Sequence, residues 1–241
     1  MKKISLLILA LLLIASPAWA TIIFEDSFTG SASGTELESH TPDTTGTSWS
    51  KISSAGSGNL QINADVTSIQ SAGIDAAGSS IYTADATYST ANYEVEATFP
   101  VFNTSGSNGR TMNLFCRYQD ANNFYLAWLE DSAGNTDVRL YSVVAGTATL
   151  IGSSDTNPAS GNVFTLVCNG NQISLKKNGA NVINPVTNSD HTTAGKAGIG
   201  AGDFTGITSA VSGGVNIRVG LFKVNTLTSA PTRRGTVIFF P

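Results

Sequence analysis

The feature that most constrains this chain is a two-residue alternation of apolar and polar side chains that recurs after residue 20. No segment there shows the 3.6-residue apolar period of an amphipathic helix. Alternating stretches bounded by Gly, Asn, Asp and Ser are typical of half-buried strands. Their number and spacing predict an all-β fold, an antiparallel β-sandwich. The expected strands cover residues 22–28, 59–63, 80–84, 92–102, 110–119, 123–130, 137–144, 147–153, 163–170, 172–179, 180–186, 196–202 and 215–227.

Two hairpins are marked by their turn residues. Asn169-Gly170 and Asn178-Gly179 each separate two alternating segments. Asn-Gly is a preferred pair for a two-residue hairpin turn, because both positions need positive φ. The two turns predict an antiparallel meander of three consecutive strands.

A third hairpin is expected in "NLFCRYQDANNFYLAWL", with residues 119–123 as the loop. This register sorts the side chains into two faces, because neighbours in a strand point to opposite sides. The expected core face holds Leu114, Cys116, Tyr118, Phe124, Leu126 and Trp128. The opposite, semi-open face holds Phe115, Arg117, Tyr125 and Ala127.

The first twenty residues have the pattern of a secretory signal peptide. Lys2 and Lys3 precede an apolar run over residues 4–15, and Ala18 and Ala20 supply the small residues of a cleavage site. The run is shorter than the roughly 20 residues that span a bilayer. We therefore expect residues 1–20 to be removed and the rest to be secreted or otherwise extracytoplasmic.

The remaining chain is expected to form one sandwich domain over residues 21–227, followed by a tail over residues 228–241. Thr236–Phe240 at the end of the tail is apolar and β-prone. It could add a strand beside Thr21, or it could pair with a neighbouring molecule and produce self-association.

Charge excludes two classes of partner. Without Lys2 and Lys3, the chain has 11 basic and 17 acidic residues and a net charge of −6. It lacks the basic surface that binds nucleic acid or an anionic membrane. Cys116 and Cys168 both lie in strand-like segments, and the sequence leaves open whether they are buried thiols or a disulfide.

The ordered set of segments resembles the concanavalin A-like lectin/glucanase superfamily, and most closely laminin-G-like domains of bacterial extracellular and phage proteins. "FEDSFTG…GTELESHTPDTTGTSW" is similar to the opening strand and loop. "YEVEATF", "LFCRYQDANNFYLAWL" and "DVRLYSVVAGTATLIGS" are similar to the central hairpins, and "VFTLVCNGNQISLKKNG" and "AGKAGIGAG…VNIRVGLFKV" to the closing strands. The resemblance implies a jelly-roll sandwich. Many members bind glycans on or beside a concave sheet, and some cleave them.

Glu94 and Glu96 in "NYEVEATF" raise the question of glycoside hydrolysis, which uses paired carboxylates. In a strand they share one face, about 6.6 Å apart along the chain. The glucanases of the superfamily place a third acidic residue two or three positions further on, where this chain has Thr98 and Phe99. We therefore favour a solvated strand face, with a hydrolase as an alternative.

Other chemistries lack support in the sequence. His40 and His191 have no neighbours at metal-ligand spacing, and neither a G-x-S-x-G nor a G-x-x-x-x-G-K motif is present. Residues 130–137, "EDSAGNTD", lack the order of a calcium loop and are expected to form a hairpin turn. We expect no cofactor, although the resemblance allows a structural calcium that the sequence does not place.

Carbohydrate binding is the hypothesis that remains. Sugar sites combine aromatic faces with planar polar groups. By the same alternation, one sheet face is expected to carry Glu94, Glu96, Arg117, Tyr125, Arg139 and Tyr141. The sequence therefore predicts a secreted, non-catalytic glycan-binding or adhesion module. The alternatives are a structural surface protein that assembles through its terminal strands and a glycoside hydrolase.

Overall fold

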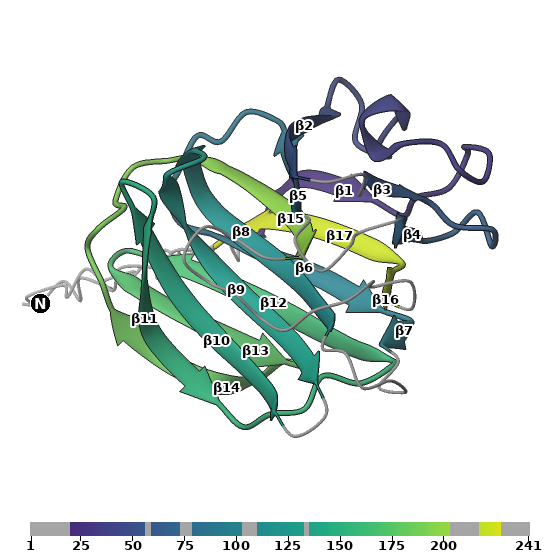
Figure 1. The fold of residues 1–241 in the computed structure, drawn as a ribbon. Coiled ribbons are helices and arrows are strands. Elements are labelled where there is room, and N and C mark those ends of the chain that lie inside the picture. The colour runs from purple at the N-terminus through teal and green to yellow at the C-terminus, as the bar shows by residue number, and fades with distance from the viewer. Residues whose placement is uncertain are drawn as a thin grey trace, which may run out of the picture.

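The structure, a computed structural model, describes residues 20–55, 59–72, 79–102, 110–132, 135–202 and 217–227. This part of the chain consists of antiparallel strands and one short 3₁₀ turn, η1 (Leu37–Ser39). Two large sheets face each other and a smaller sheet lies beside them (Figure 1). None of the described residues belongs to a helix that is long and apolar enough to cross a bilayer.

Each sheet contains neighbouring strands that are not consecutive in the chain, which is the jelly-roll arrangement. The six-stranded sheet has the order β1 (Ile22–Asp26), β17 (Leu221–Thr226), β6 (Tyr93–Phe99), β12 (Asn162–Asn169), β13 (Gln172–Lys177), β14 (Ala180–Thr187). The seven-stranded sheet has the order β11 (Thr147–Ser154), β10 (Asn135–Val144), β9 (Asn123–Ser132), β8 (Arg110–Asp120), β15 (Lys196–Gly202), β5 (Ser79–Asp85), β2 (Ser48–Ala55). The small sheet has the order β3 (Asn59–Ile62), β4 (Ile69–Ala72), β16 (Ile217–Val219), β7 (Val101–Phe102).

The main core lies between the two large sheets and extends under the small one. β6 shows how alternation builds it. Tyr93, Val95, Ala97 and Phe99 are fully buried, whereas the residues between them are only partly buried. The predicted all-β, antiparallel jelly-roll class is confirmed, because side chains of both large sheets fill one interior.

The predicted meander is present as β12, β13 and β14. Its second turn is centred on Asn178 and Gly179, which both have positive φ, as Asn-Gly turns require. Its first turn is centred on Gly170 and Asn171, one residue later than predicted.

The hairpin of β8 and β9 differs from its predicted register. Cys116 pairs with Tyr125 and Asp120 with Asn123, so three residues of β8 oppose one residue of β9. Arg117, at the start of this bulge, has a φ of 51°. A bulge of this kind changes which face each later side chain takes. Leu114 and Cys116 lie in the main core as predicted. Four other expected core residues are buried on the opposite face of the sheet: Tyr118, Phe124, Leu126 and Trp128.

A disulfide joins the two large sheets. Cys116 on β8 and Cys168 on β12 are bonded, with their Cα atoms 6.8 Å apart and both side chains fully buried. The sequence had left this question open.

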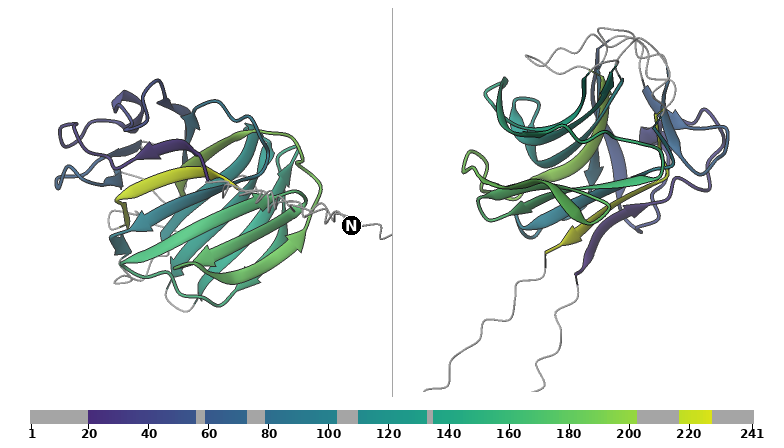
Figure 2. Two further views of the ribbon diagram at one scale, coloured as in Figure 1. Left: turned by 180° about the vertical axis from the view of Figure 1, so that it is seen from behind. Right: turned by 90° about the horizontal axis from the view of Figure 1, so that it is seen from below.

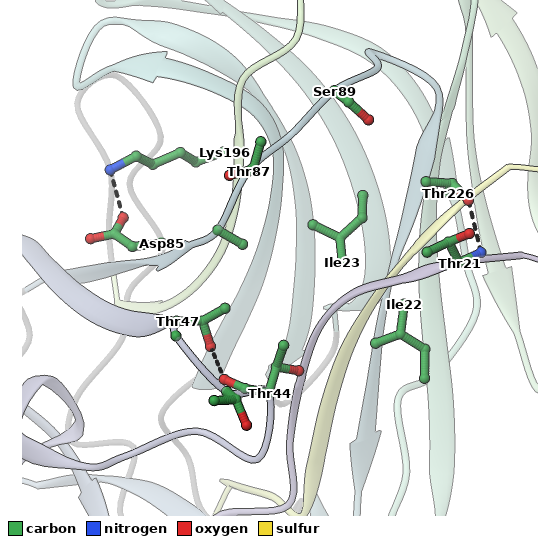
Figure 3. A pocket seen from close by; sticks show the side chains of 13 residues that line it. Thr21, Ile22, Ile23, Thr44, Thr47, Asp85, Thr87, Ser89, Lys196 and Thr226 are labelled. Atoms are coloured by element: carbon green, nitrogen blue, oxygen red, sulfur yellow. Dashed lines mark hydrogen bonds and ion pairs between the residues drawn. The ribbon is translucent and has the colours of Figure 1, made fainter.

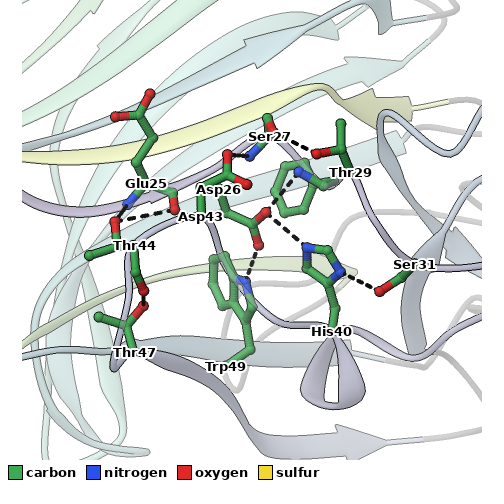
Figure 4. Close-up of polar contacts among 11 residues, drawn as sticks. Glu25, Asp26, Ser27, Thr29, Ser31, His40, Asp43, Thr44, Thr47 and Trp49 are labelled. Atoms are coloured by element: carbon green, nitrogen blue, oxygen red, sulfur yellow. Dashed lines mark hydrogen bonds and ion pairs between the residues drawn. The ribbon is translucent and has the colours of Figure 1, made fainter.

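The long loop between β1 and β2 is held by a buried carboxylate (Figure 4). Asp26 accepts hydrogen bonds from Trp49 Nε1 at 2.6 Å and from the Phe28 amide at 2.7 Å. His40 Nε2 lies 2.9 Å from the same carboxylate, and His40 Nδ1 lies 2.8 Å from Ser31 Oγ. These contacts fix both ends and the middle of the loop.

The first and last described strands are neighbours. The Thr21 amide donates to Thr226 Oγ1 at 2.9 Å, and the Thr226 amide donates to the Thr21 carbonyl at 2.9 Å. β1 and β17 therefore bring the two ends of the sandwich together (Figure 2). Residues 1–19 and 228–241, with the predicted signal peptide and the predicted extra strand, lie outside the described residues.

Candidate functional site

The structure divides the six predicted sugar-binding residues between the two large sheets. Glu94 and Glu96 lie on β6 and point away from the core. The other four lie on the seven-stranded sheet: Arg117, Tyr125, Arg139 and Tyr141. Because the outer faces of two packed sheets look in opposite directions, the prediction of one shared groove is wrong.

Glu94 and Glu96 lie on a charged surface of the six-stranded sheet. Lys176 Nζ on β13 is 3.7 Å from Glu94 Oε2. Lys223 on β17 is the in-register partner of Glu96, and Thr165 Oγ1 donates to Glu96 Oε2 at 3.4 Å. Cross-strand pairs of this kind are typical of a solvated sheet face. Hydrolysis through these two carboxylates stays an untested alternative.

Tyr125 was expected on an open face and is fully buried in the main core. Its hydroxyl donates to Asn188 Oδ1 at 2.6 Å and accepts from the His191 amide at 3.1 Å. Its ring packs edge-on against His191, with centroids 4.9 Å apart. Tyr125 therefore holds the loop between β14 and β15 in place.

Arg117 was expected on the same open face and is also fully buried, because the bulge turns it inward. Its Nε donates to the Ala91 carbonyl at 2.9 Å and its Nη1 to the His191 carbonyl at 2.7 Å. Burial lowers the pKa of its guanidinium below the usual value. Neither Arg117 nor Tyr125 is exposed to a ligand at the surface.

The outer face of the seven-stranded sheet carries a second apolar cluster, formed by the side chains that point away from the main core. The right-hand view of Figure 2 shows this sheet curved, with its outer face on the concave side. Tyr141 and Ala148 are partly buried against this cluster. We call it the concave-face cluster; its buried members are Ile81, Phe115, Tyr118, Phe124, Leu126, Trp128 and Val143.

Glycines in β15 leave room for these rings. Gly200 points to the concave face, and a Cβ there would lie 2.9 Å from Cε2 of Phe115. The Phe115 ring therefore covers the position that a side chain of β15 would occupy. Phe115 also packs edge-on against Phe124, with centroids 5.4 Å apart.

Charged groups border the concave-face cluster on the β10 side. Trp128 Nε1 donates to Glu130 Oε2 at 3.1 Å, and Arg139 Nη1 lies 3.4 Å from the same oxygen. The Arg139 side chain is 25% exposed, and Tyr141 is half-buried two residues further along β10. Of the six predicted residues, Arg139 and Tyr141 alone lie at the concave face.

Two polar atoms of this face have no hydrogen-bond partner in the described part of the protein. Asn113 Oδ1 and Tyr118 Oη are both buried. Asn113 is the in-register neighbour of Trp128 on one side and of Gly200 on the other. Buried polar atoms are nearly always paired, so such atoms mark places where a water or a ligand group completes the bonding.

Comparison with known proteins finds no matching family model and no matching curated protein. Solved structures do match. A CBM2 module of the Lactobacillus casei BL23 phage J-1 evolved Dit has a TM-score of 0.57 at 13% identity, over 86% of this chain and 96% of that chain. A Bacillus subtilis protein with a galectin-like fold has a TM-score of 0.56 at 12% identity, over 86% and 98%. The exoplasmic/lumenal domain of VIP36, bound to Ca²⁺ and Man3GlcNAc, has a TM-score of 0.53 at 11% identity, over 77% and 86%.

At these identities the likeness concerns the fold. The chain has the concanavalin A-like, galectin-like sandwich fold of these three structures. The narrower resemblance to laminin-G-like domains stays a prediction. No group of three or more His, Cys, Asp and Glu side chains in the described residues could hold a metal ion. A structural calcium therefore stays unplaced.

Sequence reasoning missed the concave-face cluster. The segments that supply it were correctly predicted as strands. Of its buried rings, Phe115 was placed on the semi-open face, whereas Tyr118, Phe124 and Trp128 were assigned to the interior of the sandwich. "KAGIGAG" was a signal that could have found it. A strand with glycine at every second position has one face without side chains, which leaves space for the rings of its neighbours.

Proposed function

We propose that the protein is a secreted, non-catalytic module that binds a glycan on the concave face of the seven-stranded sheet. The observation that carries the proposal is the accessible edge of the concave face, where Tyr141 and Arg139 are partly exposed beside the buried rings of the concave-face cluster. Sugar rings offer C–H faces to an aromatic ring such as that of Tyr141 and hydroxyl groups to a polar group such as the Arg139 guanidinium.

The border of the face supplies the accessible contacts. Tyr141 offers a partly exposed ring, and Arg139 offers a guanidinium on a side chain that is 25% exposed. On the outer face of the other sheet, charged side chains pair with one another across the strands. The predicted signal peptide and the extracytoplasmic settings named for lectins of this fold support secretion.

A glycan array followed by titration of the best ligand tests this proposal. Tyr141→Ala removes the partly exposed ring. Tyr118→Phe removes a buried hydroxyl of the same face and keeps the stack of this ring on Phe124. We expect Tyr141→Ala to weaken binding about tenfold, which corresponds to about 1.4 kcal/mol. Tyr118→Phe should bind like the unchanged protein, because the hydroxyl that it removes is buried. Because the Tyr118 hydroxyl has no partner in the described residues, Tyr118→Phe should leave the stability of the free protein unchanged.

Glu94→Gln on the opposite sheet is the matched control and should bind like the unchanged protein. Unchanged binding by Tyr141→Ala would refute the proposed face. Release of sugar products that is lost in Glu94→Gln or Glu96→Gln would instead support the hydrolase alternative.

A further inference from the structure

A pocket of about 690 Å³ opens where β1 begins and β5 ends (Figure 3). This volume lies within the range of small-molecule sites, about 300–1,000 Å³. Hydroxyl-bearing residues dominate its lining, with a few apolar side chains and one ion pair. The lining consists of Thr21, Ile22, Ile23, Thr44, Thr45, Gly46, Thr47, Asp85, Ala86, Thr87, Ser89, Lys196 and Thr226.

Three of the hydroxyls build the walls. Thr44 Oγ1 accepts from the Glu25 amide at 2.7 Å, and Thr47 Oγ1 donates to the Thr44 carbonyl at 2.6 Å. Thr226 Oγ1 accepts from the Thr21 amide at 2.9 Å. These bonds attach the 44–47 turn to β1 and close the opposite wall between β1 and β17, so the pocket is formed before any ligand binds.

Three other hydroxyls remain available to a ligand. Thr45, Thr87 and Ser89 are exposed and make no hydrogen bond within the part of the chain that the structure describes. Beside them, Ile22 is 46% exposed and Ile23 is partly buried against the main core. The pocket therefore offers hydroxyl groups next to a small apolar surface.

The charges at the pocket compensate each other. Lys196 Nζ lies 2.5 Å from Asp85 Oδ1 at one side of the pocket, and Ser50 Oγ donates to the other carboxylate oxygen. Burial raises the pKa of Asp85, but the hydrogen bonds from Lys196 and Ser50 and the charge of Lys196 outweigh it and leave that pKa below its usual value. Asp85 is thus ionised at neutral pH, so the pair carries no net charge.

We propose that this pocket is a second binding site, which accepts one uncharged sugar unit. An uncharged polyol matches free hydroxyls around a compensated ion pair, and the C–H groups of a sugar ring match Ile22 and Ile23. Lys196 is the in-register partner of Tyr118, so the pocket adjoins one end of the concave face. The site rests on its own residues and does not require the concave face to bind.

NMR titration of the purified protein with D-mannose, D-galactose, N-acetyl-D-glucosamine and D-glucuronate tests the proposal. We expect a neutral sugar to shift the amide signals of Thr45, Thr87 and Ser89, with a dissociation constant on the order of 1 mM, because one sugar unit offers few atoms. The double change Thr87→Val, Ser89→Ala removes two free hydroxyls with little change in shape. It should weaken binding at least about fivefold. Ser89→Trp, which blocks the pocket, should abolish the shifts.

The control is Thr149→Val, an exposed threonine on β11 that should change nothing. The proposal is overturned if no neutral sugar shifts these signals, if the double variant binds as well as the unchanged protein, or if D-glucuronate binds more tightly than every neutral sugar. Tyr141→Ala distinguishes the two sites. If Tyr141→Ala loses array binding but keeps the NMR shifts at the pocket, the array ligand binds the concave face. If Ser89→Trp loses both array binding and the pocket shifts while Tyr141→Ala keeps both, the array ligand binds the pocket.

Discussion

Asp26 illustrates how much of this fold depends on single polar side chains. Its carboxylate is completely buried and is contacted by Trp49, His40 and the Phe28 amide. A buried carboxylate is tolerated only when its oxygens are satisfied, and here the donors come from up to 23 positions away. The residues next to Asp26 in the sequence do not indicate these partners, so the hydrogen-bond network of Asp26 was not predicted.

We predict that Asp26→Ala lowers the free energy of unfolding by about 3 kcal/mol or more, because it leaves Trp49 Nε1 and the Phe28 amide buried without an acceptor. Urea unfolding followed by tryptophan fluorescence measures the change. Asp155→Ala, at an exposed position of the chain, is the control and should stay within about 0.5 kcal/mol. A loss below about 1 kcal/mol for Asp26→Ala would show that the network contributes little.

Arg117 shows why the candidate site was only partly predicted at the residue scale. The prediction assumed unbroken alternation through "LFCRYQ", which would place Arg117 and Tyr125 outside. A bulge that begins with positive φ usually needs Gly, Asn or Asp. Because Arg117 is none of these, the sequence did not indicate a bulge at this position. Arg139 and Tyr141 lie on a strand that alternates regularly around them, and their outward placement was predicted correctly.

At the scale of elements, turns and alternation were enough to find most strands. β2 and β4 were not predicted, because "SWSKISSA" and "IQSA" are mostly polar and have few β-prone residues. Both strands are held by pairing with a more regular neighbour, β5 and β3 respectively. Such strands depend on long-range partners, and a local pattern cannot reveal them.

We predict that the double change Cys116→Ala, Cys168→Ala destabilises the protein by about 4 kcal/mol. The bond closes a loop with a sequence separation of 52, and its loss restores the entropy of the unfolded chain. Urea unfolding of the double variant and of the reduced protein should give similar midpoints. The control is a thiol count on the denatured, unreduced protein, which should be zero. Two free thiols there would contradict the disulfide.

For the whole molecule, alternation predicted the architecture but not the assignment of strands to sheets. Glu94 and Arg139 were placed on one face because both alternate correctly within their own strands. The strand order separates them: β6 lies between β17 and β12 in one sheet, and β10 lies between β11 and β9 in the other. Contacts between distant segments set this order. Local sequence does not encode which sheet a strand joins.

We predict that the whole protein loses stability in acid, below about pH 4. Three carboxylates have pKa values below the usual range. For Asp85 and Asp65, burial raises the pKa but hydrogen bonds outweigh it, and for Asp190 the hydrogen bond from Ser142 is the main cause. In this pH range the folded state binds fewer protons than the unfolded state. The contribution of these carboxylates to the free energy of unfolding is therefore fully present above the unfolded pKa of about 3.9, and it is lost as the pH falls through the lower pKa values of the folded state.

Urea unfolding at pH 6, 4 and 3 measures this loss. Asp85→Asn should reduce the difference between pH 6 and pH 3, because it removes one of the three titrating groups. A free energy of unfolding that is constant from pH 6 to pH 3 would show that these carboxylates titrate alike in the folded and unfolded states.

The pairing of Thr21 with Thr226 has a consequence for how such a module can be rearranged. Because the two ends of the sandwich are hydrogen-bonded to each other, a short linker can join them, and new termini can be opened at an exposed hairpin such as Asn178-Gly179. The same geometry suits insertion of the domain into a surface loop of another protein, since its entry and exit points lie side by side.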